Sequence, residues 1–339
     1  MLSQEYKVTA LDIDVTKVEK INNDQQITFF EILTACYFYK AAKYPNNINL
    51  IEAGLFHRFD ATNMLKSNLA SIVCSISKDH LDWLPKNEQT IEKIVFEKTS
   101  TLLNSNIIVA KQSTKETMDY IKKTISQNKS NKLFFNDDFS YSINENNFFY
   151  YEDKLGGLKL PMPNVLGQYQ LENISTAIAT LRTLDLEISD EHIKKGITNI
   201  ELKGRLQELQ TGKLKNISGK NRLIIDGGHN ESSSISISNW IKQQNQDVHL
   251  ICGMMKDKEH YEFMKHFKDV VKSITLIDIP NQVGSISKEK FKDKLNALKM
   301  EINLSQSIEE AVKLNSKYQE TICLFAGSLY MVGEVLNLN

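Results

Sequence analysis

The chain has 339 residues, of which 41% are hydrophobic and 24% are charged. This composition excludes disordered and fibrous proteins, and the length favours two domains over one. The 41 Lys and Arg residues nearly balance the 42 Asp and Glu residues, for a formal net charge of -1. No whole-chain field exists to hold nucleic acid or an anionic membrane, so a small anionic ligand at a local basic site is the charge-based option that remains.

The four cysteines stand singly in apolar segments, without the spacing of a zinc site or a disulfide framework. They are Cys36, Cys74, Cys252 and Cys323. This usage predicts reduced, buried thiols and a cytoplasmic location. The start of the sequence lacks the apolar segment of a secretory signal, and no apolar run is long enough to span a bilayer, so we expect no membrane partner.

The first 130 residues alternate between helical and strand-like patterns. Thr28 and Glu31 are spaced as the capping box of a helix over residues 28–43. Strands are expected at 48–53, 69–76 and 107–110, and helices at 88–103 and 115–125.

Residues 132–160 have a different character, because short apolar segments there are separated by Asn, Asp and Gly. The segments 133–135, 148–151 and 158–160 predict a small antiparallel β insert. Helices are expected next, at about 170–184 and 189–199.

The second half repeats the α/β alternation. Residues 201–205 are expected to form a hinge, so that a first domain covers 1–200 and a second covers 201–339. Strands at 223–226, 248–252, 274–277 and 322–325 alternate with amphipathic helices, which predicts a doubly wound parallel sheet. The fold class is therefore α/β in both domains.

Polar side chains follow the apolar residues 222–225, where Asp226, two glycines, His229 and Asn230 come in succession. Open parallel sheets bind ligands at the carboxyl ends of their strands, so this segment is a candidate site. Turn and cap roles are the alternative.

Polar residues also gather in the two segments that follow strands expected in the first domain. Arg58, Asp60 and Asn63 lie within a few residues of each other after residues 48–53. They indicate either a site at the sheet edge or a solvated loop. His80 follows residues 69–76, and a lone histidine is as often structural as functional.

Five further residues have an ordinary structural interpretation beside a functional one. Glu31 either caps its helix or offers a carboxylate to Mg²⁺. Lys98, taken alone, is a surface residue of a helix, and Asn173 suits a helix start. Arg205 brings a permanent cation to the hinge or forms a surface salt bridge, and Ser328 is favoured as a helix N-cap.

Taken together, these segments resemble the folylpolyglutamate synthase/dihydrofolate synthase branch of the Mur ligase superfamily. The resemblance covers essentially the whole chain. It rests on these segments: Thr28-x-Phe-Glu31, Glu52-Ala-Gly-Leu with Arg58-x-Asp-Ala-Thr-Asn63, Asp79-His80, Glu97-Lys98, Leu166-Gly-x-x-Gln170-x-x-Asn173, Gly204-Arg205, Asp226-Gly-x-His-Asn230, Gly253-Met-x-x-Asp257-Lys258 and Gly327-Ser-Leu-Tyr-x-Val-Gly-Glu334.

The resemblance implies an ATP-dependent ligase that joins L-glutamate to dihydropteroate or to a folate through an acyl phosphate, with Mg²⁺ as cofactor. It also implies a Mur-ligase-like central domain, a C-terminal glutamate ligase domain and a monomer. The implied metal ligands are Glu31, His80 and a carbamylated Lys98. Asn173 and His229 would border the adenine, Asp226 the ribose and Arg205 the phosphates, while Arg58, Asp60, Asn63 and Ser328 would serve the folate and glutamate.

One departure from the family pattern concerns the phosphate loop. G-x-x-x-x-G-K-[ST] occurs nowhere in the sequence. His57 also stands where the family usually has Gly, and Leu84-Pro85 where it usually has Leu-Gly. We hypothesise an N-terminally incomplete copy of a working ligase, which would bind ATP poorly. The alternative is an inactive, degenerate paralogue that keeps the folate or nucleotide pocket as a binding module. A nicotinamide-dependent dehydrogenase is disfavoured, because no G-x-G-x-x-G follows any strand.

Overall fold

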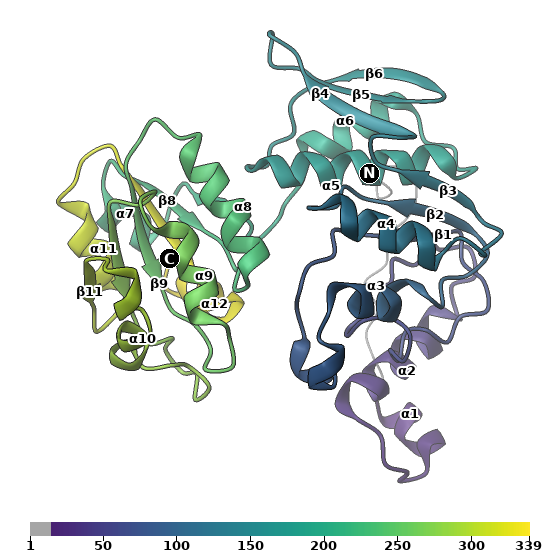
Figure 1. Cartoon of the computed structure of the whole chain (residues 1–339), viewed down its shortest axis with the longest axis horizontal. Coiled ribbons are helices and arrows are strands. Elements are labelled where there is room, and N and C mark those ends of the chain that lie inside the picture. Colours follow the sequence, from purple (N-terminus) through teal and green to yellow (C-terminus); the bar gives the residue numbers. More distant parts are fainter. Residues whose placement is uncertain (1–14) are drawn as a thin grey trace. The chain divides into compact units, whose positions relative to one another are not determined.

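A computed structural model describes residues 15–339, and within it the chain divides into two compact units (Figure 1). Unit 1 ends at Asn199 and leaves out the short segment Asn164–Gln170, which packs with the residues of unit 2. Unit 2 continues from Ile200 to Asn339. The expected hinge at 201–205 therefore lies at the start of unit 2. Among the described residues, no helix is long and apolar enough to cross a membrane.

Unit 1 is built on a three-stranded parallel sheet in the order β1-β2-β3. Ile94 and Val95 of one helix and Ile121 of another are fully buried against Ile107 and Val109 of the central strand. The elements up to the end of the sheet are α1 (Val15–Asn22), α2 (Phe29–Ala41), β1 (Ala70–Val73), α3 (Ile91–Thr99), β2 (Asn106–Val109), α4 (Lys115–Thr124) and β3 (Asn131–Phe134), with 3-10 turns η2 (Leu81–Trp83) and η3 (Lys86–Glu88).

A separate antiparallel sheet follows, in the order β4 (Phe139–Ile143), β5 (Phe149–Asp153) and β6 (Gly156–Leu160). The predicted insert is thus present, but residues 133–135 do not belong to it, because β3 pairs in parallel with β2. Helices α5 (Gln168–Thr183) and α6 (Asp190–Thr198) come next. Arg182 of α5 holds the insert through Asp153, with Nε 2.8 Å from Oδ2 and Nη2 3.1 Å from Oδ1.

The strand expected at 48–53 is not formed. These residues have no regular secondary structure, and Leu50 is 76% exposed. A strand requires a neighbour to take its backbone hydrogen bonds, and none of the described strands pairs with this segment. β1 is consequently an edge strand of the described sheet, with Ile72 in it and Leu69 just before it about half exposed. Cys74, expected to be buried, is exposed at the end of this edge strand.

Unit 2 contains a six-stranded sheet in the order β11-β10-β9-β12-β8-β7. Five strands are parallel, while β7 runs antiparallel to β8, so the expectation of a wholly parallel sheet is wrong at this edge. The strands are β7 (Gln207–Leu209), β8 (Arg222–Ile225), β9 (Val248–Cys252), β10 (Ser273–Leu276), β11 (Ile302–Leu304) and β12 (Ile322–Ala326).

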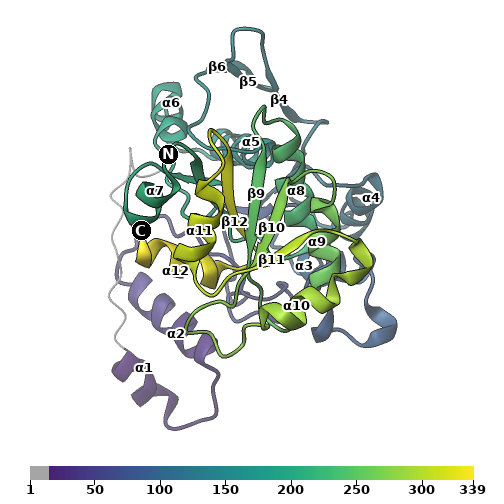
Figure 2. The same cartoon turned by 90° about the vertical axis from the view of Figure 1, so that its left-hand side faces the viewer.

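Helices cover both faces of this sheet, as predicted (Figure 2). In β12, Leu324 belongs to the core under α8, α9 and α10, whereas Phe325 belongs to the core under α7, α11 and α12. This alternation explains why the central strands β9 and β12 are buried at every position. The helices are α7 (Lys213–Ser218), α8 (Glu231–Lys242), α9 (His260–Met264), α10 (Lys288–Lys294), α11 (Ile308–Ser316) and α12 (Leu329–Leu338), with 3-10 turns η4 (Lys265–Phe267) and η5 (Asn296–Leu298).

Candidate functional site

Asp60 organises the loop that follows residues 48–53. Its Oδ2 accepts hydrogen bonds from the N–H groups of Gly54 and Leu55, at 3.0 and 2.8 Å. Its Oδ1 accepts from the N–H and the hydroxyl of Thr62, at 3.0 and 2.5 Å. Burial works against the charge, but these hydrogen bonds prevail and lower the pKa of Asp60. Asp60 is therefore an ionised brace of its own loop.

Arg58 fastens the same loop to α3. Its backbone N–H donates to Glu97 O at 2.9 Å, and its Nη1 lies 3.3 Å from Glu97 Oε1. The side chain of Glu97 is only 8% exposed, so the surface position expected for this part of the helix is wrong for Glu97. The Asn63 amide donates to Arg58 O at 3.2 Å and to Thr101 Oγ1 at 3.0 Å. Sequence reasoning named Glu97 but did not pair it with Arg58, because the two residues lie 39 positions apart.

Lys98 and His80 come together around Phe56. Lys98 Nζ lies 5.8 Å from the centre of the Phe56 ring, and that ring meets the His80 ring edge-on at 6.2 Å. Phe56 and His80 both hold left-handed backbone conformations, with φ of 53° and 55°. Such conformations cost about 1–3 kcal/mol each in bulky residues and are concentrated at functional sites. Phe56 was not predicted, because nothing in the sequence reports its φ.

The electrostatics of Lys98 suit the carbamate that the family resemblance implies. Burial lowers the pKa of Lys98, while Asp79 and Cys74 oppose the shift. A lowered pKa increases the fraction of neutral amine, which is the form that reacts to give a carbamate. The half-buried Lys98 is thus not the simple surface residue expected from its helix alone.

Glu31 has the capping role that its spacing predicts. Its N–H donates to Thr28 Oγ1 at 3.2 Å, and its Oε2 accepts from Thr28 N–H at 2.8 Å. The hydrogen bonds with Thr28 lower the pKa of the Glu31 carboxyl. In residues 15–339, no group of three or more His, Cys, Asp or Glu side chains is placed to hold a metal ion. A metal role for Glu31 stays a prediction.

In unit 2, Asp226 lies at the carboxyl end of β8 and is 3% exposed. Its Oδ2 accepts from Leu206 N–H at 2.9 Å and its Oδ1 from Gly228 N–H at 2.7 Å, while the Tyr169 hydroxyl is 3.5 Å from Oδ2. Burial raises the pKa of Asp226 against the effect of these bonds. Leu206 is left-handed, with φ 46°, so Asp226 holds a strained residue next to Arg205.

Arg205 and His229 lie on either side of this carboxylate in the sequence. Nη1 of Arg205 donates to Gly204 O at 3.1 Å, and Gly204 O also accepts from Gly227 N–H at 2.8 Å. His229 Nδ1 lies 3.2 Å from Gly227 O. The charge of Arg205 favours the ionised form of Asp226. Sequence reasoning missed Tyr169, although it stands at a variable position inside the segment 166–173.

Ser328 has the N-cap role favoured from the sequence, since its Oγ accepts from Tyr330 N–H at 3.1 Å. The preceding Gly327 has φ 117°, and a Cβ placed there would be 2.7 Å from Gly253 O. The backbone that follows β12 therefore passes close to the backbone that follows β9, its neighbour in the sheet.

Asn173 is exposed on α5 within unit 1, whereas Asp226 and His229 belong to unit 2. Their shared role around an adenine ring stays a prediction.

Comparison with known proteins shows what this chain is similar to. Residues 204–329 match the family described as Mur ligase, glutamate ligase domain. The dihydrofolate synthase/folylpolyglutamate synthase of Escherichia coli is 27% identical over 342 residues, which cover 99% of this chain and 75% of the relative.

Two solved structures extend the comparison. Escherichia coli FolC in complex with DHPP and ADP is 25% identical, with a TM-score of 0.79 over 95% of this chain and 73% of that chain. The Yersinia pestis bifunctional folylpolyglutamate synthase/dihydrofolate synthase, solved with AMPPNP and a Mn ion, has a TM-score of 0.78 at 23% identity, over 95% of this chain and 74% of that chain. This chain thus carries the glutamate ligase domain of the Mur ligases and is homologous, through both of its units, to the dihydrofolate synthase/folylpolyglutamate synthases.

Proposed function

We propose that this protein joins L-glutamate to dihydropteroate or to a folate at the expense of ATP. The observation that carries the proposal is the homology to dihydrofolate synthase/folylpolyglutamate synthases across 91–99% of the chain in three bacterial relatives. Residues 204–329, which match the glutamate ligase domain, lie within unit 2, where Asp226 and Ser328 are buried at the carboxyl edge of the sheet. The protein is proposed to act as a cytoplasmic monomer.

The reaction has two steps. The γ-phosphoryl group of ATP passes to a carboxylate of the acceptor, which gives ADP and an acyl phosphate. The amine nitrogen of glutamate then attacks the acyl carbon, phosphate leaves, and an amide forms. Phosphoryl transfer depends mainly on positioning and charge neutralisation, and Arg205 supplies a permanent cation for that purpose.

The remaining site residues divide between substrates. Asp226, His229 and Asn173 are proposed to bind the nucleotide. Arg58 is the cation available to the folate side, within a loop that Asp60 and Asn63 shape.

The metal of this reaction is proposed to be Mg²⁺, held by Lys98 as its carbamate, His80 and Glu31. Lys98 and His80 fit such a group, because they share the Phe56 ring and burial lowers the pKa of Lys98. Glu31 is the least suited of the three proposed metal ligands, because its carboxylate already accepts a hydrogen bond from Thr28 N–H. Bound Mg²⁺ would supply neutralisation of phosphate charge.

The test is ADP release by the purified protein with ATP and Mg²⁺, measured with and without L-glutamate, and with dihydropteroate or tetrahydrofolate as acceptor. A ligase releases ADP over repeated turnovers only when acceptor and glutamate are both present, because the acceptor alone allows no more than the single ADP of the first step. Mass spectrometry of the acceptor then shows one added glutamyl residue. Arg205→Met should abolish both signals. Binding of an acceptor without any ADP release would instead support the binding-module alternative.

A further inference from the structure

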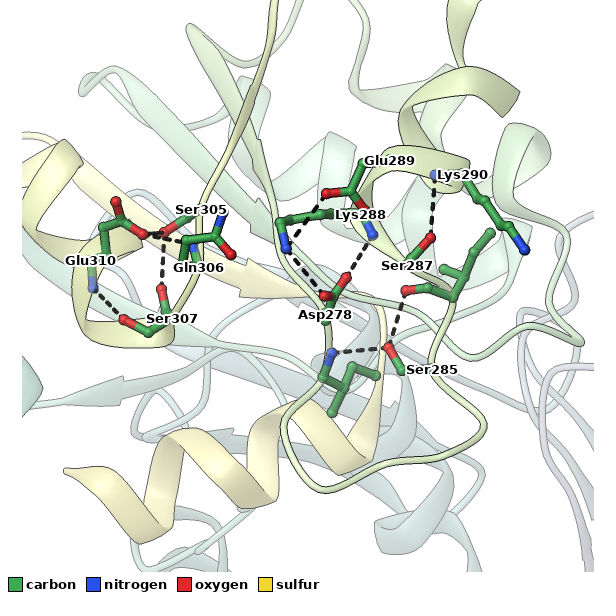
Figure 3. Close-up of polar contacts among 12 residues, drawn as sticks. Asp278, Ser285, Ser287, Lys288, Glu289, Lys290, Ser305, Gln306, Ser307 and Glu310 are labelled. Atoms are coloured by element: carbon green, nitrogen blue, oxygen red, sulfur yellow. Dashed lines mark hydrogen bonds and ion pairs between the residues drawn. The ribbon is translucent and has the colours of Figure 1, made fainter.

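The loop between β10 and α10, residues 277–287 (the β10 loop), is closed by polar contacts at its base (Figure 3). Lys288 N–H donates to Asp278 Oδ1 at 2.6 Å, and Lys288 Nζ lies 3.1 Å from Asp278 Oδ2. Ser285 Oγ accepts from Ile279 N–H at 2.9 Å. The Lys288 side chain is 9% exposed and the Asp278 side chain 48%, so the lysine end of this contact is the buried one.

The β10 loop is joined to the loop between β9 and α9, residues 253–259 (the β9 loop). Ile286 N–H donates to Met254 O at 3.0 Å, and Lys256 N–H donates to Gly284 O at 2.8 Å. The Lys256 ammonium adds a bond to Val283 O at 2.9 Å. The two loops therefore hold each other at the carboxyl edge of the sheet.

The β9 loop has a second set of anchoring contacts, at His260. The Lys294 ammonium, which has donors only, lies 3.2 Å from His260 Nδ1. Nδ1 must then accept, so the proton of the neutral ring is on Nε2, which lies 3.0 Å from Met255 O. His260 is 3% exposed and meets the Phe291 ring edge-on at 5.1 Å. The ring thus ties the β9 loop to α10.

The neutral state of His260 is part of this fastening. Burial lowers the pKa of His260 to about 4, and Lys294 on α10 lowers it too. The bond to Met255 O and the carboxylate of Asp257, in the β9 loop itself, oppose the shift. A protonated ring could no longer accept from Lys294 and would face its positive charge.

We propose that His260 is a positioning residue, which fixes the β9 loop against the start of α12. The β9 loop lies directly against the residues that precede α12, because a Cβ at Gly327 would be 2.7 Å from Gly253 O and 3.0 Å from Met254 Cγ. Under the proposed function this edge belongs to the glutamate ligase domain, so the loop's position sets the affinity for L-glutamate. That last step rests on the proposed function, whereas the fastening itself does not.

The test compares His260→Leu with His260→Gln, whose amide can still donate to Met255 O. The matched control is His249→Leu, at the opposite end of β9. His249 is also 3% exposed, with its Nδ1 2.8 Å from Ser273 Oγ, but it touches neither loop. Amide hydrogen exchange is read at Lys256 and Ile286 relative to the core strand β12, and L-glutamate binding is measured by calorimetry.

His260→Leu is expected to raise exchange at both amides, and to weaken L-glutamate binding, by about fivefold to tenfold, the value of one hydrogen bond. In His260→Gln, exchange and L-glutamate affinity should both stay within about twofold of the unaltered protein. In His249→Leu, the exchange at Lys256 and Ile286 relative to β12 should not change. In the unaltered protein, ¹⁵N spectra should show the Nε2–H form down to pH 5.

Unchanged exchange in His260→Leu, or the same rise in His249→Leu, would overturn the proposal. Raised exchange in His260→Leu, with no L-glutamate binding by the unaltered protein, would retain the fastening and count against the proposed function.

Discussion

Replacing Asp226 by alanine is expected to lower the free energy of unfolding of unit 2 by about 3 kcal/mol, because a buried donor without a partner costs about 1–3 kcal/mol. The carboxylate accepts from the N–H of the buried Leu206 at 2.9 Å and from the N–H of the half-buried Gly228 at 2.7 Å. Leu206 is 1% exposed, so water cannot replace the lost bond there without rearrangement. The left-handed φ of Leu206 would also lose its support.

Two milder variants separate the contributions of the individual hydrogen bonds to this loss of stability. In Asp226→Asn, one donor would face an amide nitrogen, so a loss of about 1–2 kcal/mol is expected. Tyr169→Phe removes the 3.5 Å contact with Asp226 together with a hydrogen bond to Gln170, so a loss of about 1 kcal/mol is expected. Urea unfolding followed by fluorescence suits this series, because the buried Trp240 reports on unit 2 whereas Trp83 is 70% exposed. A loss below about 1 kcal/mol in Asp226→Ala, at an unchanged m value, would refute the reasoning.

Three further predictions concern packing, ion pairing and pH. Gly327→Ala should lower the free energy of unfolding of unit 2, measured in urea, by about 2–3 kcal/mol, because the new Cβ would lie 2.7 Å from a backbone oxygen. The control Gly333→Ala has open space around its Cβ and should raise the free energy of unfolding by up to about 1 kcal/mol. Arg182→Lys should lower the free energy of unfolding, measured by thermal unfolding, by about 3 kcal/mol, because lysine cannot make both hydrogen bonds to Asp153, whose side chain is 5% exposed. A loss under about 1 kcal/mol would contradict this. Stability should fall by about 1–2 kcal/mol as the pH drops from 6.5 to 4, because unfolding lets His260 take up the proton that its folded pKa of about 4 excludes; His260→Gln should flatten that slope.

The parts of the fold that were predictable depend on local signals. The capping pair of Thr28 and Glu31 marks the start of α2, and four apolar runs mark β8, β9, β10 and β12 at nearly their observed bounds. The three-residue strands β7 and β11 escaped prediction, because they are too short to show a period. The strand predicted at 48–53 was wrong for the opposite reason. Its apolar pattern is present, but a strand also needs a neighbouring strand to pair with, and no described strand pairs with these residues.

The site was less predictable than the fold, because the nature of each residue does not reveal what it contacts. Asp60 and Arg58 lie in one short motif, yet they are not equivalent as substrate-binding candidates. Asp60 accepts four bonds from its own loop, so a ligand would have to displace some of them. Arg58 is 35% exposed and has one 3.3 Å contact with Glu97, over the faces of Phe59 and Phe96. A five-donor guanidinium on aromatic faces can bind an anion without disturbing that loop. Within this motif, the charge that meets a substrate carboxylate is therefore expected to be that of Arg58, and Asp60 to determine only where Arg58 lies.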